Sequence, residues 1–516
     1  MMKKFTPTGL IAAAALAFGV FNAPAALASK DVTVAVPIAV DSLDPYNTNS
    51  TLSMAVGKSY YEGLFAFDKD LKIVNLLATG YDVSADGLVY TIKLKHGVKF
   101  QDGTDFNAEA VKVNIDRVMD KANHLARFNQ FNRIKSVEAV DPYTVKFTLT
   151  EPFSPFINSL AHPSAMMISP AALKKYGKDI AFHPVGTGPF EFVDWKPSEY
   201  LKVKKFAGYW DKSYPKIDNL TFRTVTDNNT RAAVIQTGEA QFVYPVPYEQ
   251  AIILKKNPKL TVTDSPSISV KYLSFNMLQK PFDNLKVREA INYAINKNAL
   301  IKVAFGGYGG PMEGVVPESV DYGVKMKPWP YDPAKARELL KEAGYPKGFT
   351  STLWSAYNDG TSVKVVQFVQ QQLAQVGIKV SLQVLESGQR VQQVQSVQNP
   401  KDAQVRILYA GWSSSTGEAD WALRPLFDSS AWPPVLNNTA YYKNPAVDAD
   451  IAKALVITDR KQKAAIYKDA QEKIWKDAPW AFLAIPSNIS AQSKNLTGMY
   501  TMPDGSFEFR GIDLKQ

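Results

Sequence analysis

The amino-acid sequence predicts an α/β protein with parallel or mixed sheets, divided into about two or three domains. The chain has 516 residues, which is too many for one small module. Apolar residues make up 46% of the sequence and aromatic residues 12%, which is enough for a large buried core. Segments with strand periodicity alternate with segments of helical periodicity, which is typical of α/β domains. In such domains ligands bind outside the carboxyl ends of the strands.

In the first half of the chain, the alternation of apolar and polar residues predicts half-buried strands. The clearest case is residues 90–95, where every second side chain is apolar. Asn107 can cap a helix that reaches about Met119. The expected elements, in chain order, are a strand at 32–36, a helix at 51–61, a strand at 90–95, a turn at 102–103, a helix at 107–119, a strand at 143–149 and a tight glycine loop at 186–189.

In the second half, capping and stop residues set the expected ends of the helices. Asp332 caps a helix with Pro333 at its first position, and Gly344 stops it. Gly377 closes the next helix in the same way. The expected elements are strands at 272–276, 378–385, 405–409 and 480–485, and helices at 332–343, 361–376 and 460–475.

Residues 1–28 have the pattern of a secretory signal peptide. Lys3 and Lys4 give a basic start, residues 10–21 form a short apolar stretch, and Ala26-Leu27-Ala28 provides a small-residue cleavage site. The apolar stretch is shorter than the about 20 residues that a spanning helix needs, and an uncleaved anchor is the alternative. We therefore expect cleavage near Ala28-Ser29, export, and a soluble mature protein.

The composition excludes several kinds of chemistry. The chain has no cysteine, which excludes disulfides, thiolate metal sites, iron–sulfur clusters and a cysteine nucleophile. The four histidines are scattered, and there is no Walker-type loop, no G-x-S-x-G elbow and no H-E-x-x-H helix. The net charge of +10 suits an anionic ligand or membrane surface, but no basic cluster with interleaved aromatics points to nucleic acid. We expect no catalytic residue, no metal site and no cofactor.

Segments spread over the whole chain carry a family resemblance. They are Leu43-Asp44-Pro45, residues 86–111, VGTGPF at 185–190, KFAGYWD at 205–211, residues 276–295, YDPAKARELLKEAGYP at 331–346 and YAGW at 409–412. In this order they resemble the periplasmic solute-binding proteins of peptide, nickel and oligopeptide ABC importers. The resemblance implies a two-lobed fold with an extra α/β domain on lobe 1 and a two-crossover hinge. Lobe 1 would comprise residues 29–270 and 487–516, with the extra domain at about 70–185, and lobe 2 would comprise residues 271–486.

A narrower resemblance, carried by residues 160–178, 227–242, 370–380 and 411–427, is to the glutathione-binding members of that family in Gram-negative bacteria. It implies a monomeric periplasmic protein that binds glutathione, γ-glutamyl-cysteinyl-glycine, in the cleft between its lobes. The protein would deliver this ligand to a permease in the inner membrane, and a cytoplasmic ATPase would drive import. The alternative ligands within the family are a dipeptide, an oligopeptide or a metal chelate.

Glutathione presents two carboxylates and one ammonium, so its site needs cations or backbone N–H groups, an acceptor for the ammonium, and an apolar wall. The family pattern implies ligand contacts at three places. The first is the loop Asn49-Ser50-Thr51, for which helix capping is the alternative. The second is Trp412 with Ser413-Ser414-Ser415 and Glu418-Ala419-Asp420 after it, although core packing is the alternative for Trp412. The third is Lys364, for which a solvated lysine is the alternative.

Among the residues after Trp412, Ser415 departs from the peptide-binding relatives, which carry an Asp there to pair the amino group of the peptide. The departure disfavours plain peptides and suits a ligand whose ammonium lies beside its own carboxylate. Glu418 or Asp420 would then accept the ammonium, and a helix N-terminal carboxylate is the alternative for Asp420. A rival function is a secreted hydrolase that uses Ser413-Ser414-Ser415 with these acids, although no His lies nearby in the sequence.

Four more residues complete the predicted site. Arg127 and Arg390 are candidate carboxylate partners, and Tyr357 can stack on the ligand or hydrogen-bond to it. His162 is a candidate cleft contact, with a structural hydrogen-bonding role as the alternative. A role as a chaperone or sensor that uses the same cleft also remains open.

Overall fold

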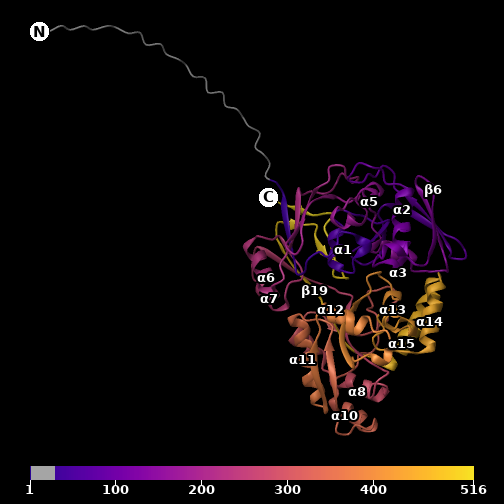
Figure 1. Ribbon diagram of the computed structural model, residues 1–516. Helices are drawn as coiled ribbons and strands as arrows, with labels where there is room; N and C mark the ends of the chain where they lie inside the picture. Colours follow the sequence, from indigo (N-terminus) through magenta and orange to yellow (C-terminus); the bar gives the residue numbers. More distant parts are fainter. Residues whose placement is uncertain (2–28, 516) are drawn as a thin grey trace.

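The computed structural model describes Met1 and residues 29–515, so the signal peptide predicted at 1–28 lies outside the described residues. The chain forms two bodies, with the indigo and magenta first half above the orange second half in Figure 1. Each body contains a mixed β-sheet flanked by helices, as the alternation of strands and helices predicts. We call the upper body lobe 1 and the lower body lobe 2.

The main sheet of lobe 1 has seven strands in the order β12-β19-β11-β1-β10-β9-β8. They are β1 (Asp31–Val36), β8 (Phe190–Lys196), β9 (Tyr200–Lys205), β10 (Asn219–Thr224), β11 (Phe242–Val243), β12 (Leu260–Ser265) and β19 (Asn488–Ser493). The central strand β1 is parallel to both of its neighbours, whereas the outer strands pair antiparallel. Because β19 lies between β12 and β11, the end of the chain returns to lobe 1.

The sheet of lobe 2 has six strands in the order β14-β18-β13-β17-β15-β16, and it is buried on both faces. They are β13 (Ser269–Phe275), β14 (Gly310–Pro311), β15 (Phe349–Ser355), β16 (Ile378–Val384), β17 (Ile407–Ser413) and β18 (Trp480–Ile485). Successive side chains of a strand point to opposite faces. In β13, Tyr272 therefore packs in one core and Leu273 in the other. Burial on both faces explains the uninterrupted apolar sequence of β18.

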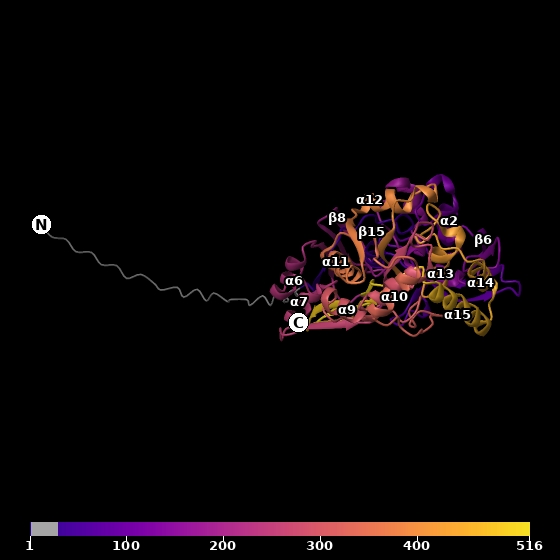
Figure 2. The ribbon, with the colours of Figure 1, turned by 90° about the horizontal axis from the view of Figure 1, so that it is seen from below.

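Helices cover the two faces of this sheet. One face carries α8 (Leu285–Ala294), α9 (Lys297–Ala304), α10 (Pro333–Glu342) and α11 (Gly360–Ala374), and the other carries α13 (Asp420–Phe427), α14 (Pro445–Val456) and α15 (Arg460–Asp477). Figures 1 and 2 both show α11 and the α14–α15 pair on opposite sides of lobe 2. The short helix α12 (Ser387–Arg390) follows β16.

Lobe 1 also contains a smaller antiparallel sheet in the order β4-β5-β7-β6, which packs against α2. Its elements are β4 (Ala78–Val83), β5 (Val89–Leu94), β6 (Ile134–Asp141), β7 (Thr144–Leu149) and α2 (Ala108–Met119). The remaining α-helices of lobe 1 are α1 (Thr51–Gly57), α3 (Phe128–Phe131), α4 (Phe156–Ala161), α5 (Pro170–Tyr176), α6 (Asn228–Thr237) and α7 (Tyr248–Leu254). Its remaining strands form three two-stranded antiparallel sheets, which are β2 (Phe65–Phe67) with β3 (Ile73–Asn75), β20 (Leu496–Thr497) with β23 (Asp513–Leu514), and β21 (Tyr500–Thr501) with β22 (Phe507–Glu508).

The predicted helix caps are confirmed. Asn107 accepts the backbone N–H of Ala110, and Asp332 caps α10 with Pro333 at its start. The helix predicted at 51–61 is too long, because it ends at Gly57. The backbone carbonyl of Tyr60 accepts hydrogen bonds from Gly188 N–H and Gln101 Nε2, which belong to distant segments, instead of continuing the helix.

The strand predicted at 405–409 is shifted, because β17 begins at Ile407 and runs on to Ser413. Pairing with β13 continues through the Trp412–Val270 and Ser413–Ser269 pairs, which keeps these residues extended. Trp412 and Ser413 therefore lie at the end of a strand in the middle of the lobe 2 sheet and not in a free loop.

The glycine loop at 186–189 is held by a buried carboxylate. Glu62 is 2% exposed and accepts hydrogen bonds from Thr187 Oγ1 (2.9 Å), Tyr209 Oη (2.7 Å) and Trp210 Nε1 (2.9 Å). Burial raises the pKa of Glu62. A Cβ on Gly186 would lie 2.1 Å from the Tyr60 carbonyl oxygen, so the loop can approach only because this residue is glycine.

We predict that Thr187→Val destabilises the protein, because it leaves a buried carboxylate oxygen with one donor fewer. The free energy of unfolding should fall by about 1–3 kcal/mol, measured by urea denaturation at neutral pH. Thr261→Val, at an exposed position of β12, is the matched control and should change it by less than about 0.5 kcal/mol. Equal effects of the two substitutions would contradict the role assigned to Thr187.

Candidate functional site

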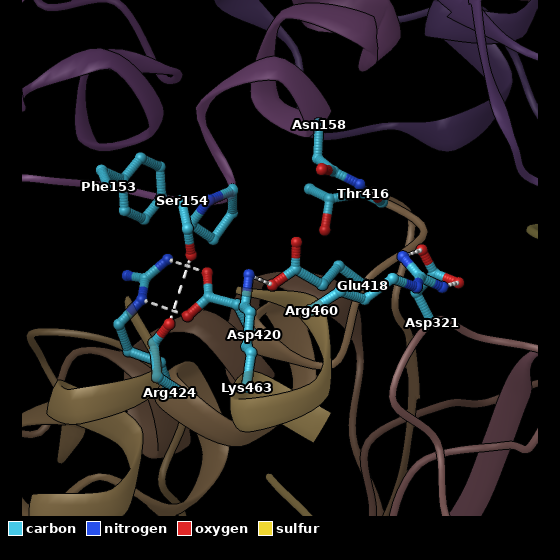
Figure 3. A network of polar contacts seen from close by, with 12 residues as sticks. Phe153, Ser154, Asn158, Asp321, Thr416, Glu418, Asp420, Arg424, Arg460 and Lys463 are labelled. Carbon is cyan, nitrogen blue, oxygen red and sulfur yellow. Dashed lines mark hydrogen bonds and ion pairs between the residues drawn. The ribbon is translucent and has the colours of Figure 1, made fainter. Parts of the chain in front are cut away.

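The lobes touch where the loop after β17 meets the end of α4. Asn158 Nδ2 donates to the Thr416 carbonyl (2.8 Å), and His162 Nε2 lies 3.2 Å from Ser415 Oγ. Figure 3 shows Asn158 and Thr416 side by side, each on the ribbon of its own lobe. These contacts lie just beyond the carboxyl end of β17, which is where α/β proteins place their ligands.

His162 is buried and is oriented by lobe 1. Its Nδ1 lies 2.8 Å from Ser164 Oγ, which donates to Gln130 Oε1. The fold thus brings together Ser415 and His162, which is the nucleophile–base pair that a hydrolase would need. The two residues are 253 positions apart in the chain, so the sequence alone does not reveal this pair. Among the described residues no carboxylate hydrogen-bonds this ring, so the acidic member of a catalytic triad is missing from it.

Trp412 and Ser413 present the end of β17 at this junction. Trp412 is half-buried and donates its Nε1–H to the Trp421 carbonyl (2.6 Å), with the two rings 6.1 Å apart. Ser413 Oγ is buried, and within residues 29–515 it has no hydrogen-bond partner. A buried hydroxyl without a partner is unfavourable, so Ser413 is a polar group that a ligand can satisfy.

Glu418 and Asp420 are held in ion pairs inside lobe 2. Glu418 pairs with Lys463, and both residues are 3% exposed. Arg424 donates to both oxygens of Asp420, through Nε (2.9 Å) and Nη2 (2.8 Å). Figure 3 shows both pairs. Burial raises the pKa of Glu418 to about 7, and Lys463 opposes this shift.

These ion pairs change the interpretation of the two acids. Each carboxylate already has a cation, so the predicted role as acceptor for a ligand ammonium does not fit the structure. Asp420 is also the first residue of α13, which is the helix N-terminal alternative considered from the sequence. The partner Lys463 lies 45 residues along the chain from Glu418, so the sequence alone could not reveal this pairing.

Two cationic side chains lie near the ring of Tyr357, and we call the three residues the cationic group. Lys271 Nζ lies 5.1 Å and Arg390 Cζ 5.9 Å from the centre of the Tyr357 ring. The Tyr357 hydroxyl accepts from Gly411 N–H (3.1 Å) and donates to the Gly411 carbonyl (3.3 Å), which fixes the ring against β17. Arg390 and Tyr357 were predicted from the sequence, and Lys271 was not. Its signal was that Lys271 is the one charged residue of β13, whose other residues are uncharged.

Neither cation of this group is neutralised by the described part of the chain. No carboxylate there lies within ion-pair distance of Lys271 or Arg390, and Arg390 Nε is buried without a hydrogen-bond partner. Lys364, predicted as a carboxylate partner, differs from these two. Its side chain is exposed and pairs with Glu249 of α7, so it links the two lobes at the surface.

On lobe 1, Arg127 and the loop before α1 form a second polar group. Arg127 Nε donates to the Thr48 carbonyl (2.8 Å), and burial lowers the pKa of Arg127 to about 10. Asp41 Oδ1 accepts from the hydroxyls of Thr48 (2.7 Å) and Ser53 (2.6 Å). Asp41 was not predicted from the sequence, although it lies beside the predicted loop.

In the loop Asn49-Ser50-Thr51, one residue caps a helix and the other two remain accessible to a ligand. Ser50 accepts the backbone N–H of Ser53 (3.2 Å) and is the N-cap of α1, which was the alternative to a ligand contact. Asn49 and Thr51 are exposed, so their side chains remain accessible.

Two larger cavities lie between the four-stranded unit of lobe 1 and lobe 2. One, of about 690 Å³, is lined by Asn158 and Glu418 among others, and one of about 540 Å³ by Arg133 and Trp421 among others. The residues around Tyr357 line neither of them. Across residues 29–515, no group of three or more His, Asp or Glu side chains is arranged to hold a metal ion, and no helix has the length and apolar character of a membrane span.

Known proteins resemble this chain over almost its full length. The family model of bacterial extracellular solute-binding proteins, family 5 Middle, matches residues 72–434. The glutathione-binding protein GsiB of Pectobacterium atrosepticum is 60% identical over 489 residues, covering 95% of each chain. The protein of the same name from Salmonella choleraesuis is 58% identical over 514 residues, covering 100% of each chain.

Solved structures share the fold. The periplasmic binding protein DppA of Helicobacter pylori, in complex with the peptide STSA, has a TM-score of 0.81 and 32% identity over 95% of this chain and 98% of that chain. A dipeptide-binding protein of a Pseudoalteromonas species, in complex with Met-Leu, has a TM-score of 0.83 and 25% identity over 94% and 100%. These neighbours confirm the predicted two-lobed fold.

Solute-binding proteins hold their ligand for transport and do not convert it, so the hydrolase considered from the sequence is wrong and the protein is not an enzyme. The family model, the relatives that align over 95–100% of the chain and the shared fold all indicate the same family. The chain therefore belongs to the bacterial extracellular solute-binding proteins of family 5.

Proposed function

We propose that this protein is the periplasmic substrate-binding component of an ABC importer and that its ligand is glutathione. The observation that carries the proposal is the 58–60% identity, over 95–100% of the chain, to proteins named as glutathione-binding. The protein delivers the tripeptide to a permease in the inner membrane, and a cytoplasmic ATPase drives import. The chain acts as a monomer after cleavage of its signal peptide near Ala28-Ser29.

The charges at the junction suit this ligand. Glutathione carries a net charge of about −1 at neutral pH, with one carboxylate beside its ammonium and the other at the glycine end. Lobe 1 offers Arg127 near Asp41, a cation and an anion together. Lobe 2 offers Lys271 and Arg390, two cations without a carboxylate partner among the described residues. A ligand that contacts both groups favours the closed form by its differential affinity for that form.

The path of the chain supports the hinge implied by the family. The chain passes from the lobe 1 sheet to the lobe 2 sheet between β12, which ends at Ser265, and β13, which begins at Ser269. It returns between β18, ending at Ile485, and β19, beginning at Asn488. We place lobe 1 at about residues 29–270 and 487–516, its extra domain at about 70–185, and lobe 2 at about residues 271–486. The boundary at 270 falls at the second residue of β13, so the first crossover of the hinge is the segment 266–268 and the second is 486–487.

We expect glutathione to bind the purified mature protein and to raise its melting temperature, as any ligand of the native state must. Isothermal titration calorimetry should give one site per chain. A dipeptide such as Met-Leu and a nickel–histidine complex, which represent the alternative ligands, should compete weakly or not at all. Absence of heat and of a thermal shift with millimolar glutathione, together with binding of the dipeptide, would establish the alternative instead.

We predict that Ser415→Asp weakens glutathione binding by about tenfold, which corresponds to about 1.4 kcal/mol. The new carboxylate would repel the anionic ligand and could accept the lone ammonium of a dipeptide, so dipeptide affinity should rise. Ser415→Asn is the matched control, because an Asn side chain has nearly the same size as an Asp side chain but carries no charge. Calorimetry with both ligands measures the change, and equal losses in the Asp and Asn variants would exclude the electrostatic explanation.

The buried His162 is expected to make the stability of the folded protein depend on pH. Burial lowers the pKa of His162 well below its usual value, and the nearby cations Arg127 and Lys58 act in the same direction. The folded protein therefore keeps this imidazole neutral, whereas the unfolded chain takes up a proton below about pH 6.5. The contribution to stability is fully present above that pH and is lost as the pH falls below it.

We therefore expect the free energy of unfolding of the wild type to fall between pH 7.5 and pH 5, by up to about 1.4 kcal/mol per pH unit from this group. His162→Gln should reduce this slope in urea denaturation series at several pH values. His124→Asn, at an exposed position with positive φ, serves as the control and should keep the wild-type slope. An unchanged slope in His162→Gln would show that other groups control the acid response.

A further inference from the structure

We propose that Lys271, Tyr357 and Arg390 form a subsite for the carboxylate at the glycine end of the ligand, the one that has no ammonium beside it. The inference rests on the proposed function and adds to it the orientation of the ligand and two residues that select it. The first argument is geometric. Lys271 comes from β13, Tyr357 follows β15, and Arg390 ends α12, so three separate segments of lobe 2 converge on one ring.

The ring of Tyr357, which both cations approach, is held in place by β17. Its hydroxyl forms two hydrogen bonds with the backbone of Gly411, at 3.1 and 3.3 Å. Lys271 faces Gly411 across the β13–β17 pair, and a Cβ at Gly411 would lie 2.8 Å from Lys271 Nζ. Glycine at this position therefore gives the lysine the space to extend over β17 toward Tyr357. A ring that is already held in one position reduces the entropy lost when a ligand binds against it.

The second argument is the lack of a counter-ion. The two carboxylates that are close in sequence are engaged elsewhere. Asp359 caps α11 through the backbone N–H groups of Thr361 and Ser362, and Glu386 accepts from Asn358 Nδ2 (2.9 Å). Arg390 Nε is buried, and within residues 29–515 it has no hydrogen-bond partner. A buried guanidinium donor without an acceptor is unfavourable, and a ligand carboxylate removes that penalty.

The third argument selects which carboxylate binds. Two cations without an acidic neighbour attract a carboxylate and repel an ammonium. The γ-glutamyl end of glutathione carries both groups on one carbon, so it suits the mixed pair Arg127 and Asp41 of lobe 1. The glycine end carries a carboxylate alone, so it suits Lys271 and Arg390. The γ-glutamyl end therefore lies toward lobe 1 and the glycine end toward lobe 2.

The test compares glutathione with its glycine amide, which lacks this one charge, on the wild type and on Lys271→Gln and Arg390→Gln. Each substitution should weaken glutathione binding by about ten- to a hundredfold. The amide should bind the wild type more weakly by a similar factor and should lose little further affinity in either variant, as a double-mutant cycle requires. Lys379→Gln, at an exposed position of β16 in the same lobe, is the matched control and should bind both ligands like the wild type.

The outcomes separate this inference from the proposed function. Failure of the wild type to bind glutathione would remove both. Equal affinity of the wild type for glutathione and its amide, or equal losses for both ligands in the two variants, would overturn the subsite while leaving the proposed function intact. The comparison of the two ligands on the wild type needs no variant, so misfolding of a variant cannot obscure it. Lys271→Arg keeps the charge and should retain discrimination between acid and amide.

Discussion

The register between β13 and β17 is the constraint on which the candidate site depends. It sets Lys271 opposite Gly411 and Val270 opposite Trp412 in the middle of the lobe 2 sheet. β15 pairs in parallel with β17 on its other side, and the chain that leaves β15 brings Tyr357 back to the Gly411 backbone. A shift of one residue would turn every side chain of β13 to the opposite face. The two buried cores fix the register, and the register in turn fixes the cationic group.

Much of the fold could be predicted from the sequence, because local signals and tertiary structure agree in most elements. Asn107 and Asp332 cap the helices that they were expected to cap, and the apolar run of β18 is buried on both faces. The prediction was wrong where contacts with distant segments determine where an element ends. The helix at 51–61 stops early because the Tyr60 carbonyl bonds to Gly188, a residue 128 positions away. Local periodicity contains no information about such a partner.

The candidate site was predictable to a smaller extent, for the same reason. His162 and Ser415 lie together as members of one junction, although 253 residues separate them, and Tyr357 and Arg390 lie together on lobe 2. Whether a charged residue is available to a ligand depends on its partner, which the sequence does not show. Glu418 is neutralised within its own lobe and Lys364 by a residue of the other lobe, whereas Lys271 has no carboxylate within ion-pair distance among the described residues.

The pairing of the acids also gives a physical reason for the ligand selectivity that we propose. A plain peptide carries a lone ammonium at one end, and its binding needs a free carboxylate. The acids that follow Ser415 in the sequence, Glu418 and Asp420, are each held by a cation, and burial raises the pKa of Glu418 to about 7, so neither offers an unopposed negative charge. Breaking a buried ion pair to release one of them would cost about 3–5 kcal/mol. A lone ammonium is therefore disfavoured at this lobe, whereas a ligand that carries its ammonium beside a carboxylate has no need of such an acceptor there.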